Sequence, residues 1–413
     1  MILSFMISVN AYSQSNESDP LSRVRDLVNS DEIIFINSET LGGNPSNQNI
    51  KSRVFDIDLF QINPDTKLVP KPVQTDSIIS GNKRMAVTSG NYLGEQFKHL
   101  VSAWTGLNNS ITLMIPQINS GTFAWNAANR MTLNNTLLPS TRSPKLPVRL
   151  TSGNYYGDKK EEFVLGYVGL DSTVKLKMFT VNNSLVPVKG DSIGNEKMFF
   201  STGAKLDAFD IVSGDFDGDG FQEIGLVFVK KNVSGWTVTV RIYDFNSSGN
   251  FISKGTATLF SQPSYNISNI QISISAKDFN YDAIDEIAAG YAFTHANIAQ
   301  PGTYVDIVQI KDSLNTIIAN STRRATLDLV NESESRPFDI SAGDLNGDGI
   351  NDIAVGSRGN IYAYTVLNST LVPQLRISGP SVNGWGSGSS EAIDISEKVM
   401  VAGDLDYNRK ADI

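Results

Sequence analysis

The residues of this sequence that could do chemistry are gathered in one acidic loop, Gly214 to Ile224, which reads G-D-F-D-G-D-G-F-Q-E-I. Its carboxylates are Asp215, Asp217, Asp219 and Glu223. Ca²⁺ takes six to eight oxygen ligands at about 2.3–2.6 Å, so a short loop must turn every second side chain inward. A glycine, here Gly220, permits the sharp bend that this requires. The loop therefore predicts a site for a hard cation.

Related loops recur along the chain at a nearly constant spacing. The aligned copies begin at Gly90, Gly153, Gly214, Lys277, Gly343 and Gly403. Their starts lie 60 to 66 residues apart, and each copy follows a short run typical of a β-strand, such as Val399 to Ala402. A period of this length is the mark of a repeat architecture.

A second marker keeps the same period. A turn that contains asparagine and is followed by Leu-Val-Pro or Leu-Leu-Pro ends at Pro70, Pro139, Pro187 and Pro373. In the unit that holds the acidic loop, strand-type runs cover Ile224 to Val229, Trp236 to Tyr243 and Phe251 to Phe260. Four strands in units of 60–66 residues predict an all-β fold, a β-propeller of six or seven four-stranded blades. The acidic loop would join the first strand of a blade to the second.

The composition excludes several kinds of partner and site. The 413 residues carry a formal net charge of -9 without a dense Lys/Arg run, which argues against nucleic acid and against a polybasic membrane anchor. Cysteine is absent and the only histidines are His99 and His295, so any metal should be bound by oxygen. No run of about 20 apolar residues predicts a membrane span.

The first residues indicate export. Residues 1–13 resemble the back half of a clipped secretory signal peptide, because the apolar run Ile2 to Val9 precedes the small residues Ala11 and Ser13. A buried N-terminal strand is the alternative. We assign 14–30 to a lead-in and 31–413 to the propeller, and we expect a secreted or cell-surface protein, of a bacterial type because it lacks cysteine.

The two ends of the chain allow two readings of the blade number. The sequence stops at Ile413, where a second strand should begin. In one reading, Asp394 to Ile413 supplies the inner strand of a blade shared with Asp31 to Val73, which gives six blades. In the other, the sequence is truncated at its C-terminus and the full ring has seven blades or more.

With strand, acidic loop, E/D-I and strand repeated, the chain resembles the FG-GAP/VCBS repeat family, the propeller type of integrin α-subunit heads. The resemblance covers roughly Asp31 to Ile413 and is most specific at Gly214 and Gly343; the literal Gly-Ala-Pro is replaced by A-A-G-Y and A-V-G-S. It implies a calcium-stabilised propeller in a binding or adhesion protein. It also implies that loop positions 1, 3, 5 and 9 give side-chain oxygens and position 7 a backbone carbonyl.

Carried onto this sequence, those positions predict four Ca²⁺ sites. The predicted ligands are Asp215, Asp217, Asp219, Glu223 and the carbonyl of Phe221; Asp344, Asn346, Asp348, Asp352 and the carbonyl of Ile350; Asp278, Asn280, Asp282, Glu286 and the carbonyl of Ile284; and Asp404, Asp406, Asn408 and Asp412. The first two sets keep glycine at position 6, whereas Ala283 and Arg409 stand there in the others and should strain a bend with positive φ. The copies at Asn91 and Asn154 lack the alternating acids and are expected to be plain turns.

The acidic loops allow two other interpretations, an EF-hand and a turn that binds no metal. An EF-hand needs a bidentate glutamate at position 12, where Leu226 and Val355 stand inside strands, so that reading fails. An acidic turn without a metal must hold three or four carboxylates within about 5 Å, where their mutual repulsion is costly. This second alternative stays open.

Three functions fit these observations. The first is an exported propeller that binds a protein or a glycan, with Trp385 in the glycine-rich loop as the best exposed aromatic among Trp104, Trp125, Trp236 and Trp385. The second is a scaffold within a larger multidomain protein. The third is a propeller-type polysaccharide lyase or hydrolase, which we disfavour because no nucleophile elbow or Ser/His/Asp set is present. The sequence does not fix the ligand or the oligomeric state.

Overall fold

The structure is a computed structural model of the chain. It describes residues 3–10, 31–40, 47–57, 68–70, 74–79, 85–94, 99–105, 109–119, 122–124, 127–134, 136, 148–197, 205–207, 209–232, 235–263, 267–295, 302–311, 316–319, 325–326, 338–345, 348–357, 360–367 and 370–378.

The described strands form six sheets of four or more strands, which we call blades 1 to 6 in chain order. Blade 1 holds β1 (Leu3–Asn10), β2 (Asp31–Thr40), β3 (Asn47–Ile57), β4 (Leu68–Pro70) and β5 (Gln74–Ile79). Blade 2 holds β6 (Met85–Gly90), β7 (His99–Thr105), β8 (Ile111–Met114) and β11 (Arg130–Leu133). Blade 3 holds β12 (Arg149–Gly153), β13 (Glu162–Val168), β14 (Thr173–Val181) and β15 (Pro187–Lys197).

The second half of the chain repeats this plan. Blade 4 holds β17 (Phe209–Gly214), β18 (Glu223–Asn232), β19 (Gly235–Phe245) and β20 (Phe251–Pro263). Blade 5 holds β21 (Ile267–Lys277), β22 (Glu286–His295), β23 (Gly302–Lys311) and β24 (Thr316–Ala319), with β16 (Lys205–Asp207) and β25 (Ala325–Thr326) at its sides. Blade 6 holds β26 (Phe338–Gly343), β27 (Asp352–Ser357), β28 (Asn360–Leu367) and β29 (Thr370–Ser378). A hairpin of β9 (Gln117–Asn119) and β10 (Thr122–Ala124) and the short helix η3 (Ala127–Asn129) lie between strands of blade 2.

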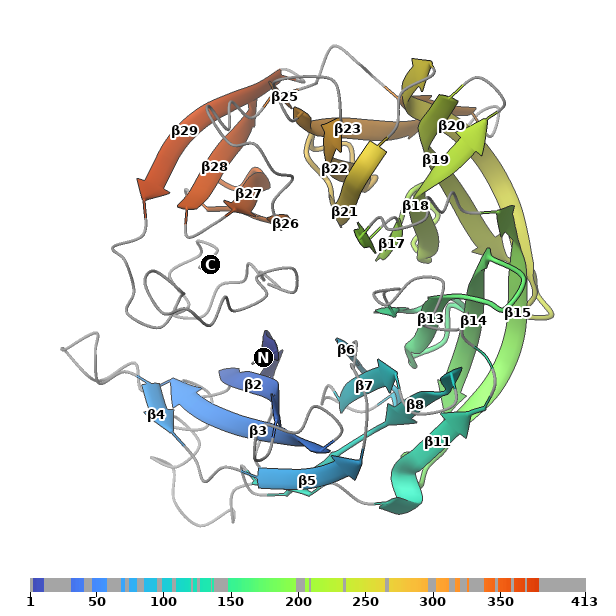
Figure 1. Ribbon diagram of the computed structural model, residues 1–413, viewed down its shortest axis with the longest axis vertical. Coiled ribbons are helices and arrows are strands. Elements are labelled where there is room, and N and C mark those ends of the chain that lie inside the picture. The colour runs from blue at the N-terminus through green and yellow to red at the C-terminus, as the bar shows by residue number, and fades with distance from the viewer. Residues whose placement is uncertain are drawn as a thin grey trace.

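The blades are arranged around a common centre, as a β-propeller (Figure 1). Their first strands face this centre, and the first strands of neighbouring blades contact each other from β1 through β6, β12, β17 and β21 to β26. Blades 3, 4 and 6 are plain antiparallel meanders in which sequential strands pair. The prediction of an all-β propeller with four-stranded blades is thus confirmed.

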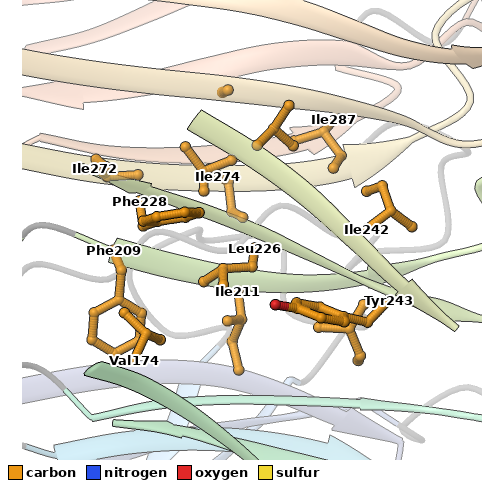
Figure 2. Close-up of a cluster of buried hydrophobic side chains, with 14 of the residues drawn as sticks. Val174, Phe209, Ile211, Leu226, Phe228, Ile242, Tyr243, Ile272, Ile274 and Ile287 are labelled. Atoms are coloured by element: carbon orange, nitrogen blue, oxygen red, sulfur yellow. The ribbon is translucent and has the colours of Figure 1, made fainter. Parts of the chain in front are cut away.

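The core lies between blades rather than inside any one of them. Along β22, Ile287 and Ala289 belong to a cluster shared with blades 3 and 4, whereas Ala288 belongs to a cluster shared with blade 6. Because side chains of a strand alternate between faces, each inner blade buries both of its faces against neighbours. Figure 2 shows the first cluster, with Val174 from blade 3 and Ile272 from blade 5 on either side of blade 4. Each fully buried aliphatic or aromatic side chain contributes about 1.5–3 kcal/mol, so the blades stabilise one another.

The strands of blade 4 show how the sequence pattern maps onto this core. Trp236, Val238 and Val240 of β19 are buried on one face, as their alternation predicts. The intervening Thr237 and Thr239 are buried too, and their hydroxyl oxygens lie 3.3 Å apart. The sequence predicted one buried face, but the second face of β19 is buried as well at Thr237 and Thr239.

The N-terminal run forms a strand. β1 pairs with β2 in antiparallel register, from Leu3 opposite Ser38 to Asn10 opposite Asp31. The alternative of an N-terminal strand describes this segment, while its removal as a signal peptide stays a prediction. β1 takes the place beside β2 that one reading of the blade number gave to Asp394–Ile413, which lies outside the described residues together with the lead-in at 14–30.

Candidate metal centre

The acidic loop of blade 4 connects β17 to β18, as predicted, and is folded by its own carboxylates. The Asp215 carboxylate accepts hydrogen bonds from the backbone N–H groups of Gly218 (2.7 Å) and Gly220 (3.0 Å). Asp219 accepts the N–H of Phe221 at 2.8 Å. Gly218 and Gly220 have φ angles of 78° and 88°, which glycine adopts without the steric cost of a Cβ atom. We number the loop from Asp215 as position 1 to Glu223 as position 9, and we use the same positions in the other blades.

Three of the four predicted acids of this loop converge. One oxygen each from Asp215, Asp217 and Glu223 lie within 4.8 Å of one another. Asp219 lies outside this group, and its side chain is held by the Phe221 N–H instead. Three converging carboxylate oxygens are a donor set for a hard divalent cation, since such ions prefer oxygen and need several negative ligands.

Glu223 shows most clearly what the site lacks. The residue is 1% exposed, and its Oε2 accepts the N–H of Phe216 at 2.7 Å. Its Oε1 is buried and has no hydrogen-bond partner. Burial, together with the charges of Asp217 and Asp244, raises the pKa of Glu223 to about 9. A buried carboxylate oxygen without a partner costs about 1–3 kcal/mol or more, and a cation at this position would remove that cost.

A lysine ammonium stands beside the same site. Lys254 Nζ of β20 lies 3.5 Å from Asp217 Oδ2 and 2.9 Å from Asp244 Oδ2. Burial and the neighbouring Asp219 raise the pKa of Asp217, and Lys254 opposes this rise. Lys254 therefore offsets part of the negative charge of the site. The sequence offered no sign of this contact, because Lys254 lies 37 residues from Asp217 and reaches it from the fourth strand.

The loop of blade 5 has the same turn but a different ninth position. Asp278 accepts the N–H groups of Tyr281 (2.7 Å) and Ala283 (3.0 Å) as Asp215 does at the equivalent positions. Ala283 has a φ of 64°, so the positive φ expected at position 6 is found in a residue that has a Cβ atom. The Glu286 Oε2 accepts the N–H of Phe279 at 2.9 Å, and its Oε1 accepts the Asn280 amide. The predicted ligand Glu286 therefore already has a partner for each oxygen.

The loop of blade 6 repeats the unsatisfied carboxylate of blade 4. Asp344 Oδ2 accepts the N–H of Gly349 at 2.8 Å, and Asp348 accepts that of Ile350 at 2.8 Å. Asp352 is 2% exposed, accepts the N–H of Leu345 at 3.1 Å, and keeps Oδ1 buried without a partner. Burial raises the pKa of Asp352, the Thr365 hydroxyl and the Leu345 N–H oppose this rise, and the charges of Asp348 and Asp344 add to it.

Several predicted ligands fall outside the described residues. These are Asn346 of blade 6 and the whole set Asp404, Asp406, Asn408 and Asp412. Their assignment stays a prediction.

The copies at Asn91 and Asn154, which lack the alternating acids, also form turns. In blade 3, Asn154 accepts the N–H of Gly157 at 2.8 Å and Asp158 accepts that of Lys160 at 2.7 Å, which repeats the turn of blade 4. Position 1 is the neutral Asn154 and position 3 is Tyr156, an exposed aromatic residue, so neither position carries a carboxylate. In blade 2, Asn91 and Gly94 keep a shorter version of the turn through a 3.4 Å backbone hydrogen bond.

The acid at position 9 has a second role, in the hydrogen bonds of the turn, which the sequence did not predict. In blades 3 to 6 this acid accepts the backbone N–H of position 2, through Glu162, Glu223, Glu286 and Asp352. The signal was the acid at position 9, which the copy at Asn154 keeps as Glu162 although it lacks the alternating acids at positions 1 and 3. The acid at position 9 thus closes the turn whether or not its loop holds a cation.

The other candidate residues are placed as follows. Trp104 and Trp236 are buried, as we expected for Trp236, while Trp125 and Trp385 lie outside the described residues. His99 begins β7 and His295 ends β22, each away from the converging acids of blade 4. Among the described residues, no helix has the length and apolar character needed to cross a membrane.

Comparison with known protein families identifies one repeat of this chain. The FG-GAP repeat family matches residues 337–365, which span β26, β27 and most of β28 with the acidic loop of blade 6. No curated protein sequence matches the chain. The match includes the copy that begins at Gly343, one of the two in which the resemblance to the FG-GAP family is most specific, and it confirms that resemblance.

Three solved structures similar to this chain have low sequence identity to it, and two of them are described as propellers. Chaetomium thermophilum Sqt1 is 16% identical over 84% of this chain and 69% of its own, with a TM-score of 0.41. The Aleuria aurantia lectin, a fungal lectin described as a six-bladed β-propeller, is 9% identical over 83% of this chain and 95% of its own, with a TM-score of 0.40. The Dos1 propeller is 10% identical over 84% of this chain and 67% of its own, with a TM-score of 0.37.

Proposed function

We propose that this β-propeller with an FG-GAP repeat is an exported, calcium-stabilised module that binds a protein or a glycan. The single observation that carries the calcium part is the Oε1 atom of Glu223, which is buried without a partner and belongs to a residue that converges with Asp215 and Asp217. Asp352 repeats the observation in blade 6. Ca²⁺ is the cation that suits an all-oxygen donor set in a cysteine-free, histidine-poor chain of extracellular type.

The loops differ in how well they support a bound cation. Blades 4 and 6 combine acids at positions 1, 5 and 9 with a buried oxygen that lacks a partner. In blade 5 the Asn280 amide must first leave Glu286 before both can serve as ligands. We therefore expect Ca²⁺ to bind more tightly in blades 4 and 6 than in blade 5. The predicted site at Asp404 is a fourth.

The calcium sites are structural in this proposal. In blades 4 and 5 each loop joins consecutive paired strands, and its acids accept backbone N–H groups of the same turn. At millimolar Ca²⁺ and a dissociation constant of about 0.1–1 mM, each site would contribute on the order of 1 kcal/mol to the free energy of unfolding.

Exposed aromatic side chains support the binding part. Tyr156, Phe221 and Tyr281 come from the loops of three consecutive blades and are 39%, 43% and 62% exposed. Aromatic faces stack on sugar rings and are enriched in protein interfaces. Glycan arrays and pull-downs with the propeller test this, with Tyr281→Ala expected to lose signal, and with Leu170, which is 53% exposed in a β-turn of blade 3, replaced by alanine as the control.

Removal of metal tests the calcium proposal directly. We expect EDTA to lower the melting temperature and Ca²⁺ in excess over EDTA to restore it, because several sites of about 1 kcal/mol each act on one ring. Differential scanning calorimetry with Mg²⁺ in place of Ca²⁺ is the control. An unchanged melting curve after complete metal removal would reject the calcium proposal.

A further inference from the structure

In blades 3 to 6, the eighth residue of the loop contacts the first residue of the loop in the preceding blade. Backbone N–H groups of Glu161, Gln222 and Asp285 donate to the carbonyls of Asn91 (2.8 Å), Asn154 (3.2 Å) and Asp215 (2.7 Å). At the last described junction, the Asn351 Nδ2 donates to the carbonyl of Asp278 at 2.8 Å. Four consecutive junctions between blades are therefore closed at the same place.

At two junctions the eighth side chain returns a second hydrogen bond. The Gln222 Oε1 accepts the N–H of Asn154 at 3.0 Å, and the Asp285 Oδ2 accepts the N–H of Asp215 at 3.1 Å. Both backbone polar groups of position 1 are thus held by one residue of the next blade. We call this pair of contacts the inter-blade clamp.

The clamp explains the glycine that precedes these loops. A Cβ atom on Gly214 would lie 2.7 Å from the Phe216 ring and 3.0 Å from Asp285 Oδ2, and one on Gly153 would collide with the Gln222 amide oxygen. Blade 5 has Lys277 at this place, and there Asn351 reaches only the carbonyl of position 1. The recurring glycine therefore makes room for the complete clamp.

Asp285 occupies a special place among the clamp residues. It holds Asp215, the first predicted ligand of blade 4, and it lies between Ile284 and Glu286, two predicted ligands of blade 5. A change that orders the loop of blade 5 must also fix Asp285. The Asp215 backbone, whose position sets the direction of its carboxylate, is fixed with it.

Resting on the calcium sites of the proposed function, we propose that Asp285 is a positioning residue for the cation site of blade 4 and couples that site to the loop of blade 5. The two sites then form one unit across a blade junction. Because coupling between two binding equilibria is reciprocal, Ca²⁺ in either loop raises the affinity of the other.

Calcium titration of the whole chain by isothermal titration calorimetry tests the positioning role. Groups that orient metal ligands typically change affinity 10–100-fold when removed, so we expect Asp285→Ala to weaken the blade 4 site about tenfold. Asp285→Asn keeps an acceptor oxygen for the Asp215 N–H and should retain affinity within about threefold, which separates the hydrogen bond from the charge. The blade 4 site is recognised as the binding event that Glu223→Gln removes.

Ser152→Ala is the matched control, because it removes a hydrogen bond between blades 2 and 3, from the Ser152 hydroxyl to the carbonyl of Ser89 at 2.5 Å, and the loops of these blades lack the metal chemistry. It should lower the melting temperature with and without Ca²⁺ alike. Equal calcium affinities of the blade 4 site in Asp285→Ala and Ser152→Ala would overturn the positioning role while leaving the calcium proposal intact. A wild-type chain that takes up no Ca²⁺ would instead reject the calcium proposal itself.

The coupling has its own test. Asp282→Ala removes a predicted ligand of blade 5, and we expect it to weaken the blade 4 site about fivefold in the wild-type background and not at all in the Asp285→Ala background. An equal effect in both backgrounds would show that the two sites communicate by another route, and would overturn the coupling.

Discussion

The loops of blades 3 and 4 share most hydrogen bonds of their turn, but only the loop of blade 4 carries carboxylates at positions 1 and 3. In both, position 1 accepts the N–H of position 4, position 5 accepts that of position 7, and position 9 accepts that of position 2. Blade 4 presents Asp215 and Asp217 where blade 3 has Asn154 and Tyr156. The hydrogen-bonded turn therefore does not depend on the acids that would bind a cation.

This difference separates two roles of one motif. The turn needs oxygen acceptors at positions 1, 5 and 9, which asparagine supplies as well as aspartate. A cation needs negative charge at positions 1 and 3 in addition. Blade 3 has kept the first set and lost the second, so it serves as an internal control for each prediction below.

The largest effect should come from exchanging the chemistry of the two loops. Asp215→Asn with Asp217→Tyr gives blade 4 the residues of blade 3, and we expect the blade 4 site to weaken beyond about 10 mM because two charged ligands are gone. Calcium titration and circular dichroism check that the site is lost while the strands remain. Retained affinity would show that the acids at positions 1 and 3 are not ligands.

The reverse exchange sharpens the same comparison. Asn154→Asp, Tyr156→Asp and Lys159→Gly give blade 3 the acids and the position 6 glycine of blade 4, next to the buried Glu162. We expect one additional Ca²⁺ per chain in calorimetry. No gain in stoichiometry would show that residues beyond the loop decide binding.

The pH dependence of stability should come next in size. Burial raises the pKa of Glu162 from 4.5 to about 8, and that of Glu223 to about 9. Between pH 4.5 and these values the folded state holds protons that the unfolded state has released, so stability falls as pH rises through the window. In EDTA, urea unfolding should therefore give a lower free energy of unfolding at pH 8 than at pH 5.

Replacing each glutamate by uncharged glutamine shows how much of the pH dependence of the free energy of unfolding comes from each loop. Glu162→Gln should remove part of it with and without Ca²⁺, since glutamine still accepts the Tyr155 N–H. Glu223→Gln should remove part of it only in EDTA, because a cation competes with the proton for Glu223. A slope that neither variant changes would place the titration elsewhere.

A smaller effect is expected from the lysine beside the blade 4 site. Lys254→Met removes a partly exposed ammonium 3.5 Å from Asp217, and a pair of this kind contributes up to about 1 kcal/mol, so calcium affinity should rise up to about fivefold. Lys175→Met, which removes the 2.7 Å pair with Asp171 in blade 3, should leave it unchanged. A rise that does not shrink at high salt would contradict an electrostatic cause.

The smallest effect concerns the backbone at position 6. Ala283 has a φ of 64° and Gly220 a φ of 88°, with no atom near the place of a Cβ on Gly220. Ala283→Gly should stabilise the protein and Gly220→Ala destabilise it, each by about 1 kcal/mol, because only the steric cost of a positive φ changes. Urea unfolding measures both, and changes of the same sign would contradict this cause.

Much of the fold could be predicted from the sequence because its determinants are local and repeated. Alternation in Trp236–Tyr243, the strand before each acidic loop and the 60–66-residue period specify four-stranded units and where their loops fall. The turn at position 6 was predicted from a glycine and confirmed by its positive φ. Burial of both faces could not be predicted from the alternation, since the polar Thr237 and Thr239 are buried as well.

The candidate site was predicted as a set of residues but not as an arrangement. The oxygen-only chemistry, the positions of the acids and the loss of acids in blades 2 and 3 follow from the residues alone. The folded chain shows in addition that Glu223 and Asp352 each keep an oxygen without a partner, that Lys254 reaches Asp217, and that Asp285 holds Asp215. The motif spans nine consecutive residues and can be recognised in the sequence. The Lys254 contact joins two strands of one blade, and the Asp285 contact joins two blades, so both form only when distant segments of the chain come together.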